Sequence, residues 1–257
     1  MRLIVDTHVH IYPCYDRKLA LDNLRSNLAA LDSQAVCMAL LAERYDCGFF
    51  AEMIRNPKRI IPGPVQAECL DNAILLREAG YPDLYIIAGR QVVTAERIEI
   101  LSLTSGREIP DGLPVDEVLA MIRSDRGLPV VSWSPGKWLG QRGKVIERLF
   151  NTAVPGSLLV GDTFMRPSAL PDPSLMRLAV RNGFSLIAGS DPLPLPREER
   201  FLGRYAIRLE ADFDPDDPAG SIRALLSQPG ARPVLAGSRS GIISAVRRLI
   251  TLRKSKK

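Results

Sequence analysis

Short runs of β-branched and aliphatic residues alternate along the chain with longer stretches in which apolar residues recur every three to four positions. The first pattern is typical of buried strands and the second of amphipathic helices. Strands are expected at 2–5, 35–41, 84–89, 98–103, 128–133, 157–162, 184–191 and 232–237, and helices at 17–32, 116–125, 144–150, 173–183 and 240–250. Strands that alternate with crossover helices predict an α/β fold with parallel strands.

This alternation continues through all 257 residues without a long linker, a low-complexity block or an internal repeat. A closed α/β barrel commonly takes about 200–250 residues. We therefore expect one barrel domain over 1–257, which ends in a basic helix end and tail at about 247–257.

Composition places the chain among soluble globular proteins, with 46% apolar and 25% charged residues. The opening MRLIVDTHVH has the pattern of a strand and not of a cleaved signal, so a cytoplasmic protein with no membrane partner is expected. The four cysteines lack the CxxC spacing of a zinc ribbon. Much of the net charge of +5 lies in the tail RRLITLRKSKK, which argues against a nucleic-acid partner because such partners usually need a broader basic face.

The stretch DTHVH contains the only two histidines of the chain, His8 and His10. Residues two apart on a strand point to the same face, so both imidazoles can converge on one metal ion. Asp6 lies on that face as well. In a parallel barrel the carboxyl ends of the strands carry the chemistry, although a histidine there can also be a core residue with its hydrogen bonds satisfied.

Five segments together resemble the PHP (polymerase and histidinol phosphatase) family, in the same order along the chain. They are DTHVH, IIAGRQVVTAERIEILSL, GLPVDEVLAMIRSDRGLPVVSWSPG, RLAVRNGFSLIAGSD and RPVLAGSRSG. The resemblance implies a distorted TIM-like barrel of seven strands and seven helices, (β/α)7, and hydrolysis of phosphoesters with up to three metal ions.

Carried over by position, the resemblance keeps the HxH as His8 and His10 and the aspartate of the GSDxH motif as Asp191. Other positions where the family has metal ligands hold different residues here, namely Ala42, Glu43, Gln91, Ser134 and Leu193. Gln91 stands in place of a bridging glutamate, and a neutral amide holds a cation less firmly than a carboxylate. The remaining set is expected to hold at most one divalent ion, of zinc, manganese or iron.

Two functions remain open. The first is a metal-dependent hydrolase, a phosphoesterase for a small phosphorylated substrate, with Gln91, Ser134, Lys137 and Arg166 orienting that substrate. The second is a catalytically silent barrel that acts as a binding or assembly module. Bound ions beyond the first would imply further ligands, of which Glu43, Glu68 and Asp162 are the first candidates.

Two other motifs carry less weight. The amidohydrolases also begin with HxH, but their sites require further histidines on later strands, which this chain does not have. The segment GSRSG at 237–241 precedes the last expected helix. It can be read as a phosphate cradle or as an ordinary strand-to-helix turn.

Overall fold

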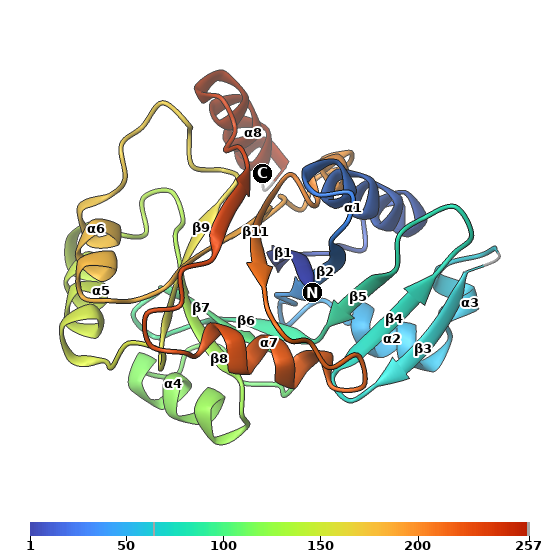
Figure 1. Ribbon diagram of the computed structural model, residues 1–257. Coiled ribbons are helices and arrows are strands. Elements are labelled where there is room, and N and C mark those ends of the chain that lie inside the picture. The colour runs from blue at the N-terminus through green and yellow to red at the C-terminus, as the bar shows by residue number, and fades with distance from the viewer. Residues whose placement is uncertain (64, 256–257) are drawn as a thin grey trace.

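The computed structural model describes residues 1–63 and 65–255, with two β-sheets flanked by helices (Figure 1). The strands are β1 (Arg2–Val9), β2 (Val36–Leu41), β3 (Gln66–Leu70), β4 (Ala73–Arg77), β5 (Leu84–Ile87), β6 (Gly89–Val93), β7 (Glu99–Leu103), β8 (Leu128–Ser132), β9 (Leu159–Thr163), β10 (Leu186–Gly189), β11 (Tyr205–Glu210) and β12 (Val234–Gly237). The helices are α1 (Arg17–Leu31), α2 (Phe49–Arg55), α3 (Pro57–Ile60), α4 (Val115–Ser124), α5 (Gly140–Thr152), α6 (Ser174–Arg181), α7 (Pro218–Leu226), α8 (Ile242–Ser255) and the 3₁₀ helix η1 (Glu198–Phe201).

The first sheet has the strand order β12-β11-β1-β2-β5-β4-β3, and the second has the order β10-β9-β8-β7-β6. Each of the eight expected strands and five expected helices is present, which confirms the α/β class. Neighbours β1 and β2, β2 and β5, β8 and β9, and β9 and β10 are parallel, as the alternation predicts.

The strands missed by the sequence pattern are antiparallel, and they interrupt the expected parallel order. Strands β3 and β4 form a hairpin around Asp71 and Asn72, with Asn72 in the left-handed region at φ 52°. Strands β6 and β7 form a second hairpin, whose turn has Arg97 at φ 61°. Antiparallel neighbours need only a short turn, whereas parallel ones need a crossover. Within the described residues the strands therefore form two sheets and not one closed parallel sheet.

Backbone hydrogen bonds join the two sheets at one edge. The N–H of Glu43, just after β2, donates to the carbonyl of Gly89 at 3.0 Å, and the N–H of Gln91 donates to the carbonyl of Glu43 at 2.9 Å. On the other side, the N–H of Asp191 after β10 donates to the carbonyl of His8 at 2.9 Å. These bonds hold the carboxyl ends of β1, β2 and β10 next to one another and next to β6.

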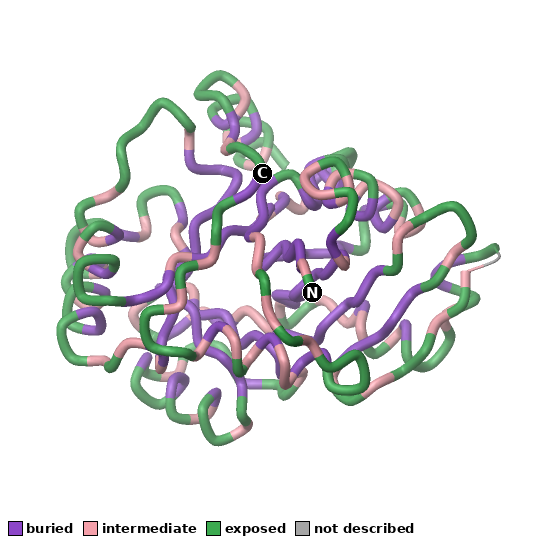
Figure 2. The backbone as a smooth tube through the Cα atoms, in the orientation of Figure 1, coloured by how far each residue is buried: buried purple, intermediate pink, exposed green. Residues whose placement is uncertain are grey.

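Three apolar clusters hold this arrangement. One packs α1 and α2 on β1, β2 and β5, and another packs α4, α5 and α6 on the outer face of β7, β8 and β9. The third lies between the sheets, with side chains from β1, β2, β7, β8 and β10. Burial is concentrated in the central strands, while the helices expose their outer faces (Figure 2). In the described part of the chain, no helix is long and apolar enough to cross a membrane.

Candidate metal centre

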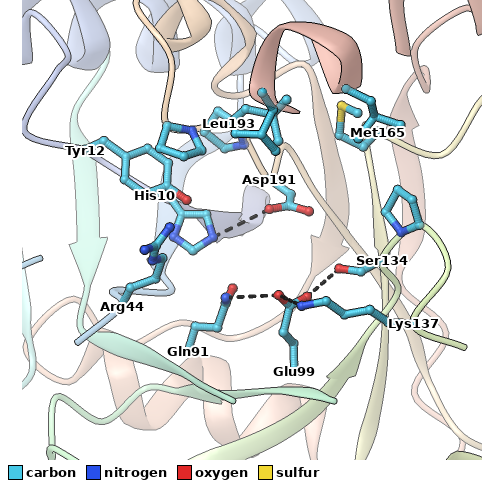
Figure 3. A pocket seen from close by; sticks show the side chains of 15 residues that line it. His10, Tyr12, Arg44, Gln91, Glu99, Ser134, Lys137, Met165, Asp191 and Leu193 are labelled. Carbon is cyan, nitrogen blue, oxygen red and sulfur yellow. Dashed lines mark hydrogen bonds and ion pairs between the residues drawn. The ribbon is translucent and has the colours of Figure 1, made fainter. Parts of the chain in front are cut away.

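The two histidines lie at the carboxyl end of β1 and face the same side. Both side chains are buried, and their Nε2 atoms are 3.0 Å apart. Asp191 follows β10, and its Oδ1 lies 3.5 Å from Nε2 of His8. The same oxygen lies 3.5 Å from Nε2 of His10 (Figure 3). Its backbone φ of 42° is in the left-handed region, which costs energy for a residue other than glycine. The fold thus holds this carboxylate in a strained conformation beside the imidazoles.

A fourth ligand atom joins this group from β6. The amide Oε1 of Gln91 lies 3.3 Å from Nε2 of His8. Nitrogen and oxygen ligands about 2.0–2.2 Å from a tetrahedral ion are roughly 3.3–3.6 Å apart, close to the separations of 3.0–3.5 Å in this group. The set of two imidazoles and one carboxylate therefore fits a single divalent ion, with the amide oxygen of Gln91 adjacent to His8 as a further donor.

The protonation states also suit a cation. Burial lowers the pKa of His10 below its usual 6.5, so the imidazole is neutral at pH 7. Burial alone would raise the pKa of Asp191, but the adjacent His8 and His10 lower it below its usual 3.8. The Oγ of Ser132 lies 3.2 Å from Nδ1 of His8 and helps to orient that ring. In the described structure, Nδ1 of His10 is buried without a hydrogen-bond partner.

Asp6 is fully buried beneath the histidines and bonds to backbone N–H groups. Its Oδ1 accepts from the N–H of His8 at 3.2 Å and of Ser190 at 2.8 Å, and its Oδ2 accepts from the N–H of Gly203 at 2.9 Å. Burial raises the pKa of Asp6 to about 6, against the opposing effect of these donors. Its carboxylate thus fixes the ends of β1 and β10, which carry His8 and Asp191.

Opposite the histidines lies a charged residue that sequence reasoning missed. Glu99, at the start of β7, accepts hydrogen bonds from the hydroxyl of Ser134 and from the ammonium of Lys137 (Figure 3). The amide Nε2 of Gln91 lies 3.5 Å from Glu99 Oε1, so Glu99 also turns the amide oxygen toward His8. The only charged residue in the mostly apolar run IEILSL was the available signal.

These groups line a cavity of about 250 Å³. His10, Gln91, Ser134, Lys137 and Asp191 lie on it, so the structure brings together most of the residues singled out from the sequence. The rest of the lining is largely apolar and includes Leu249 and Leu252 of α8, together with Tyr12, Met165 and Leu193. Arg44 adds a second cation at the edge of the cavity, where it stacks on Tyr12.

Four other candidates lie elsewhere. Arg166 is buried and pairs with Asp162, with distances of 2.7 Å from Nε to Oδ1 and 2.6 Å from Nη2 to Oδ2. Neither Arg166 nor Asp162 lines the cavity, because their pairing holds Arg166 against the end of β9. Glu43 accepts from the N–H of Phe50 at 3.1 Å, and Glu68 pairs with an arginine on the exposed strand β3.

No family model matches the chain, and no curated protein matches its sequence. Among solved structures, PsfC from Pseudomonas syringae PB-5123 has a TM-score of 0.59 at 14% identity, covering 99% of this chain and 97% of that one. The lesion-specific endonuclease PfuEndoQ from Pyrococcus furiosus has a TM-score of 0.55 at 12% identity, covering 91% of this chain and 58% of that one. Endonuclease Q in complex with a 27-mer duplex substrate with an abasic lesion at the active site has a TM-score of 0.50 at 13% identity, covering 88% and 56%.

These neighbours are PHP-type folds. At such low identity the likeness shows a shared α/β fold, which in the described residues of this chain lacks the closed (β/α)7 barrel that the resemblance implied, and leaves the activity to be argued from the site. This chain spans less than two thirds of the length of Endonuclease Q.

The comparison corrects one expectation. The absence of a broad basic face argued against a nucleic-acid partner, but two of these structures are of an endonuclease, and one contains a duplex substrate. The sequence argument failed because it considered only the distribution of basic residues. A metal centre with a few nearby cations can bind a phosphodiester without a basic stripe.

Proposed function

We propose that the chain is a metal-dependent phosphoesterase, built as one PHP-type domain over 1–257, with at most one divalent ion. The observation that carries this proposal is the convergence of ligand atoms from His8, His10 and Asp191 at separations of 3.0–3.5 Å. The amide oxygen of Gln91 lies beside them, 3.3 Å from Nε2 of His8. A bound ion would polarise a phosphoryl oxygen and lower the pKa of a coordinated water. Zinc, manganese and iron are all compatible with this donor set.

The chain's own groups orient the ester. Lys137 extends into the cavity from the loop after β8, and Arg44 lies on the same cavity after β2. Both are cations that bind phosphoryl oxygens. The hydroxyl of Ser134 is held by Glu99 and keeps its lone pairs available to a donor on the substrate. Because Arg166 is paired away from the cavity, the proposal assigns it no substrate contact and gives it the role of fixing the end of β9.

The apolar part of the lining excludes water from one side of the cavity. Leu249 and Leu252 come from α8, and Met165 follows β9. Interactions between charges strengthen where water is excluded. The same wall packs against the non-reacting part of the substrate.

The alternative is a catalytically silent module. It is favoured by Glu99, whose charge is already neutralised by Lys137, so this side of the cavity offers a weak site for a further ion. A family reaction that needs several ions cannot then proceed here. Under this alternative the cavity binds a phosphorylated ligand without turnover.

The test combines metal content with turnover. The full chain, purified without a histidine tag, is analysed for bound metals and assayed with manganese or zinc against a phosphomonoester, a small phosphodiester and a duplex containing an abasic lesion. One ion per chain with turnover that is lost in His8→Ala/His10→Ala supports the proposal. Metal binding without turnover of any ester favours the silent module, and no metal binding overturns the proposed centre.

A further inference from the structure

A second polar hollow lies near the start of α8, whereas Leu249 and Leu252, which line the cavity of the proposed metal centre, lie near the end of that helix. The segment GSRSG at 237–241 leads from β12 into α8, whose first helical hydrogen bond runs from the N–H of Ala245 to the carbonyl of Gly241. The N–H groups of the preceding residues, Ile242 to Ser244, have no acceptor within the helix. They form the positive end of the dipole of a 14-residue helix.

The hollow has a volume of about 390 Å³. We call it the α8 hollow; its polar lining residues are Asn27, Arg204, Ser238, Arg239, Ser240 and Ser244. Among the described residues that line it, none is a carboxylate. Phe164 and Phe201 form an apolar wall, with ring centroids 5.2 Å apart. Two guanidinium groups beside a helix N-terminus make this hollow electropositive.

Two buried polar atoms at the α8 hollow make no hydrogen bond within the described structure. Ser240 is only 4% exposed, and its Oγ makes no hydrogen bond within the described structure. It therefore does not cap the helix, although serine near a helix start commonly does. Nη1 of Arg239 is also buried without a hydrogen bond there, although the same guanidinium pairs with Asp172 at 3.8 Å and donates from Nη2 to the carbonyl of Ser168 at 3.4 Å. Buried polar groups in proteins are nearly always bonded, so the hydroxyl of Ser240 points to a missing ligand, and Arg239 can supply a further donor to it.

The backbone of this segment is rigidly held. The N–H of Ser240 donates to the carbonyl of Phe164 at 2.9 Å, and the N–H of Ser168 donates to the carbonyl of Ser240 at 2.9 Å. The unpaired hydroxyl therefore sits on a fixed backbone, and its lack of a partner is a property of the fold.

We propose that the α8 hollow binds a dianionic phosphoryl group. The helix N–H groups and the hydroxyl of Ser240 donate to its oxygens, and Arg239 and Arg204 neutralise its charge. The source is either free phosphate or the terminal phosphate of an organic molecule that packs on the phenyl rings. This site is separate from the proposed metal centre and does not depend on the proposed reaction.

A bound phosphoryl group would also couple to the catalytic cavity. Phe164 lines the α8 hollow, whereas the next residue, Met165, lines the cavity. Arg248 anchors α8 between them through a buried pair with Glu198, at 2.9 Å from Nε to each carboxylate oxygen. Occupancy of the hollow stabilises the first turn of the helix whose later turns supply Leu249 and Leu252.

Calorimetric titration of the full chain tests this site. The ligands are inorganic phosphate and phenylphosphonate, whose P–C bond resists hydrolysis, each compared with sodium chloride at matched ionic strength. With metal removed by chelation, so that the proposed metal centre does not bind phosphate through its ion, we expect saturable binding of one phosphoryl group, reduced at least tenfold by Ser240→Ala and by Arg239→Gln. Tighter binding of phenylphosphonate identifies an organic phosphate as the source, and binding of phosphate alone identifies free phosphate.

Two matched variants distinguish binding in the α8 hollow from binding elsewhere on the protein. Arg247→Gln removes the same charge from the exposed face of α8, outside the α8 hollow, and should leave binding within twofold. His8→Ala/His10→Ala removes the proposed metal centre and should also leave binding intact. The proposal is overturned if phosphate binds equally well to Ser240→Ala and Arg239→Gln, or if binding disappears with the histidines. Ser240→Ala removes an unpaired hydroxyl, so the free protein should unfold at an unchanged or higher temperature.

Discussion

Asp191 and Glu99 are two carboxylates on the same cavity, but their surroundings differ (Figure 3). Asp191 faces two imidazoles at 3.5 Å, and burial lowers the pKa of one of them, His10. Glu99 instead accepts from the ammonium of Lys137 and the hydroxyl of Ser134. One carboxylate thus faces two imidazoles that can share an added cation with it, whereas the other already has a cation from the chain itself.

This difference explains how one cavity can favour a single ion. An ion beside Asp191 gains a carboxylate and two imidazoles without displacing a charge. A second ion beside Glu99 would have to displace or repel the ammonium of Lys137, which is tethered and so acts at a high effective concentration. We call the His8, His10 and Asp191 side of the cavity the histidine half, and the Glu99, Ser134 and Lys137 side the Glu99 half. Gln91 lies between them, with its amide oxygen toward His8 and its amide nitrogen toward Glu99.

Removing the imidazoles should have the largest effect. We predict that His8→Ala/His10→Ala lowers affinity for zinc or manganese at least a hundredfold, about 2.8 kcal/mol, because two of three strong ligands are lost. Equilibrium dialysis with elemental analysis measures it. Cys14→Ala/Cys69→Ala removes the exposed thiols and serves as the control, which should retain the ion. Equal metal retention in the histidine variant would show that the ion binds elsewhere.

The histidine half also depends on Asp6. The two carboxylate oxygens of Asp6 accept hydrogen bonds from three backbone N–H groups. Asp6→Asn replaces one of these oxygens with an NH₂ group, which cannot accept, so at least one N–H loses its partner. Leaving a buried donor unpaired costs about 1–3 kcal/mol, so we predict a loss of about 2 kcal/mol in the free energy of unfolding, measured with urea.

The control for that variant is Asp22→Asn on α1, which removes the same charge from a half-buried pair with Lys18. Such pairs contribute about 0–1 kcal/mol. If Asp6→Asn unfolds at the same urea concentration as this control, then Asp6 does not hold the ends of β1 and β10 together.

The Glu99 half of the cavity can be changed so that it gains, and does not lose, affinity for a cation. Gln91→Glu/Lys137→Gln adds a carboxylate and removes the tethered ammonium, so Glu99 becomes available to a cation. We predict a second bound ion, or a gain of at least tenfold in affinity for manganese, about 1.4 kcal/mol, by calorimetry.

Lys144→Gln, on the exposed face of α5, provides the control for charge alone. It should change affinity by less than twofold, because exposed charges are screened by solvent and salt. No gain in the double variant, with the fold intact, would mean that the internal cation does not limit the number of ions.

The sequence predicted the histidine half of the site better than the Glu99 half. The spacing of His8 and His10 on a strand end determines their common direction, and the resemblance identified Asp191. The rule that chemistry lies at carboxyl ends of strands applies to these three residues. It fails for Glu99, because β7 runs antiparallel to β6 and β8 and brings its amino end to the cavity.

Arg166 shows the opposite failure. It follows the carboxyl end of β9, as a substrate-binding cation would, but it forms an ion pair with Asp162, four residues earlier. Buried charges have to be paired, and which partner is nearest depends on the turn after the strand. The hairpins were missed for a related reason, since Asn72 and Arg97 adopt left-handed turn conformations that the apolar pattern does not report.

The smallest expected effect concerns the proton on His10. Because burial lowers its pKa while Asp191 opposes that shift, the imidazole should titrate below 6.5 in the metal-free protein. The chain has two histidines, so NMR of ¹⁵N-histidine-labelled protein gives two titrations, and His8→Gln assigns them. Asp191→Asn should lower the pKa of His10 further, since it removes a carboxylate that favours the imidazolium. A midpoint at or above 6.5 would mean that protons compete with the metal for His10 near neutral pH. The metal affinity of the histidine half would then be lower at neutral pH than its geometry implies.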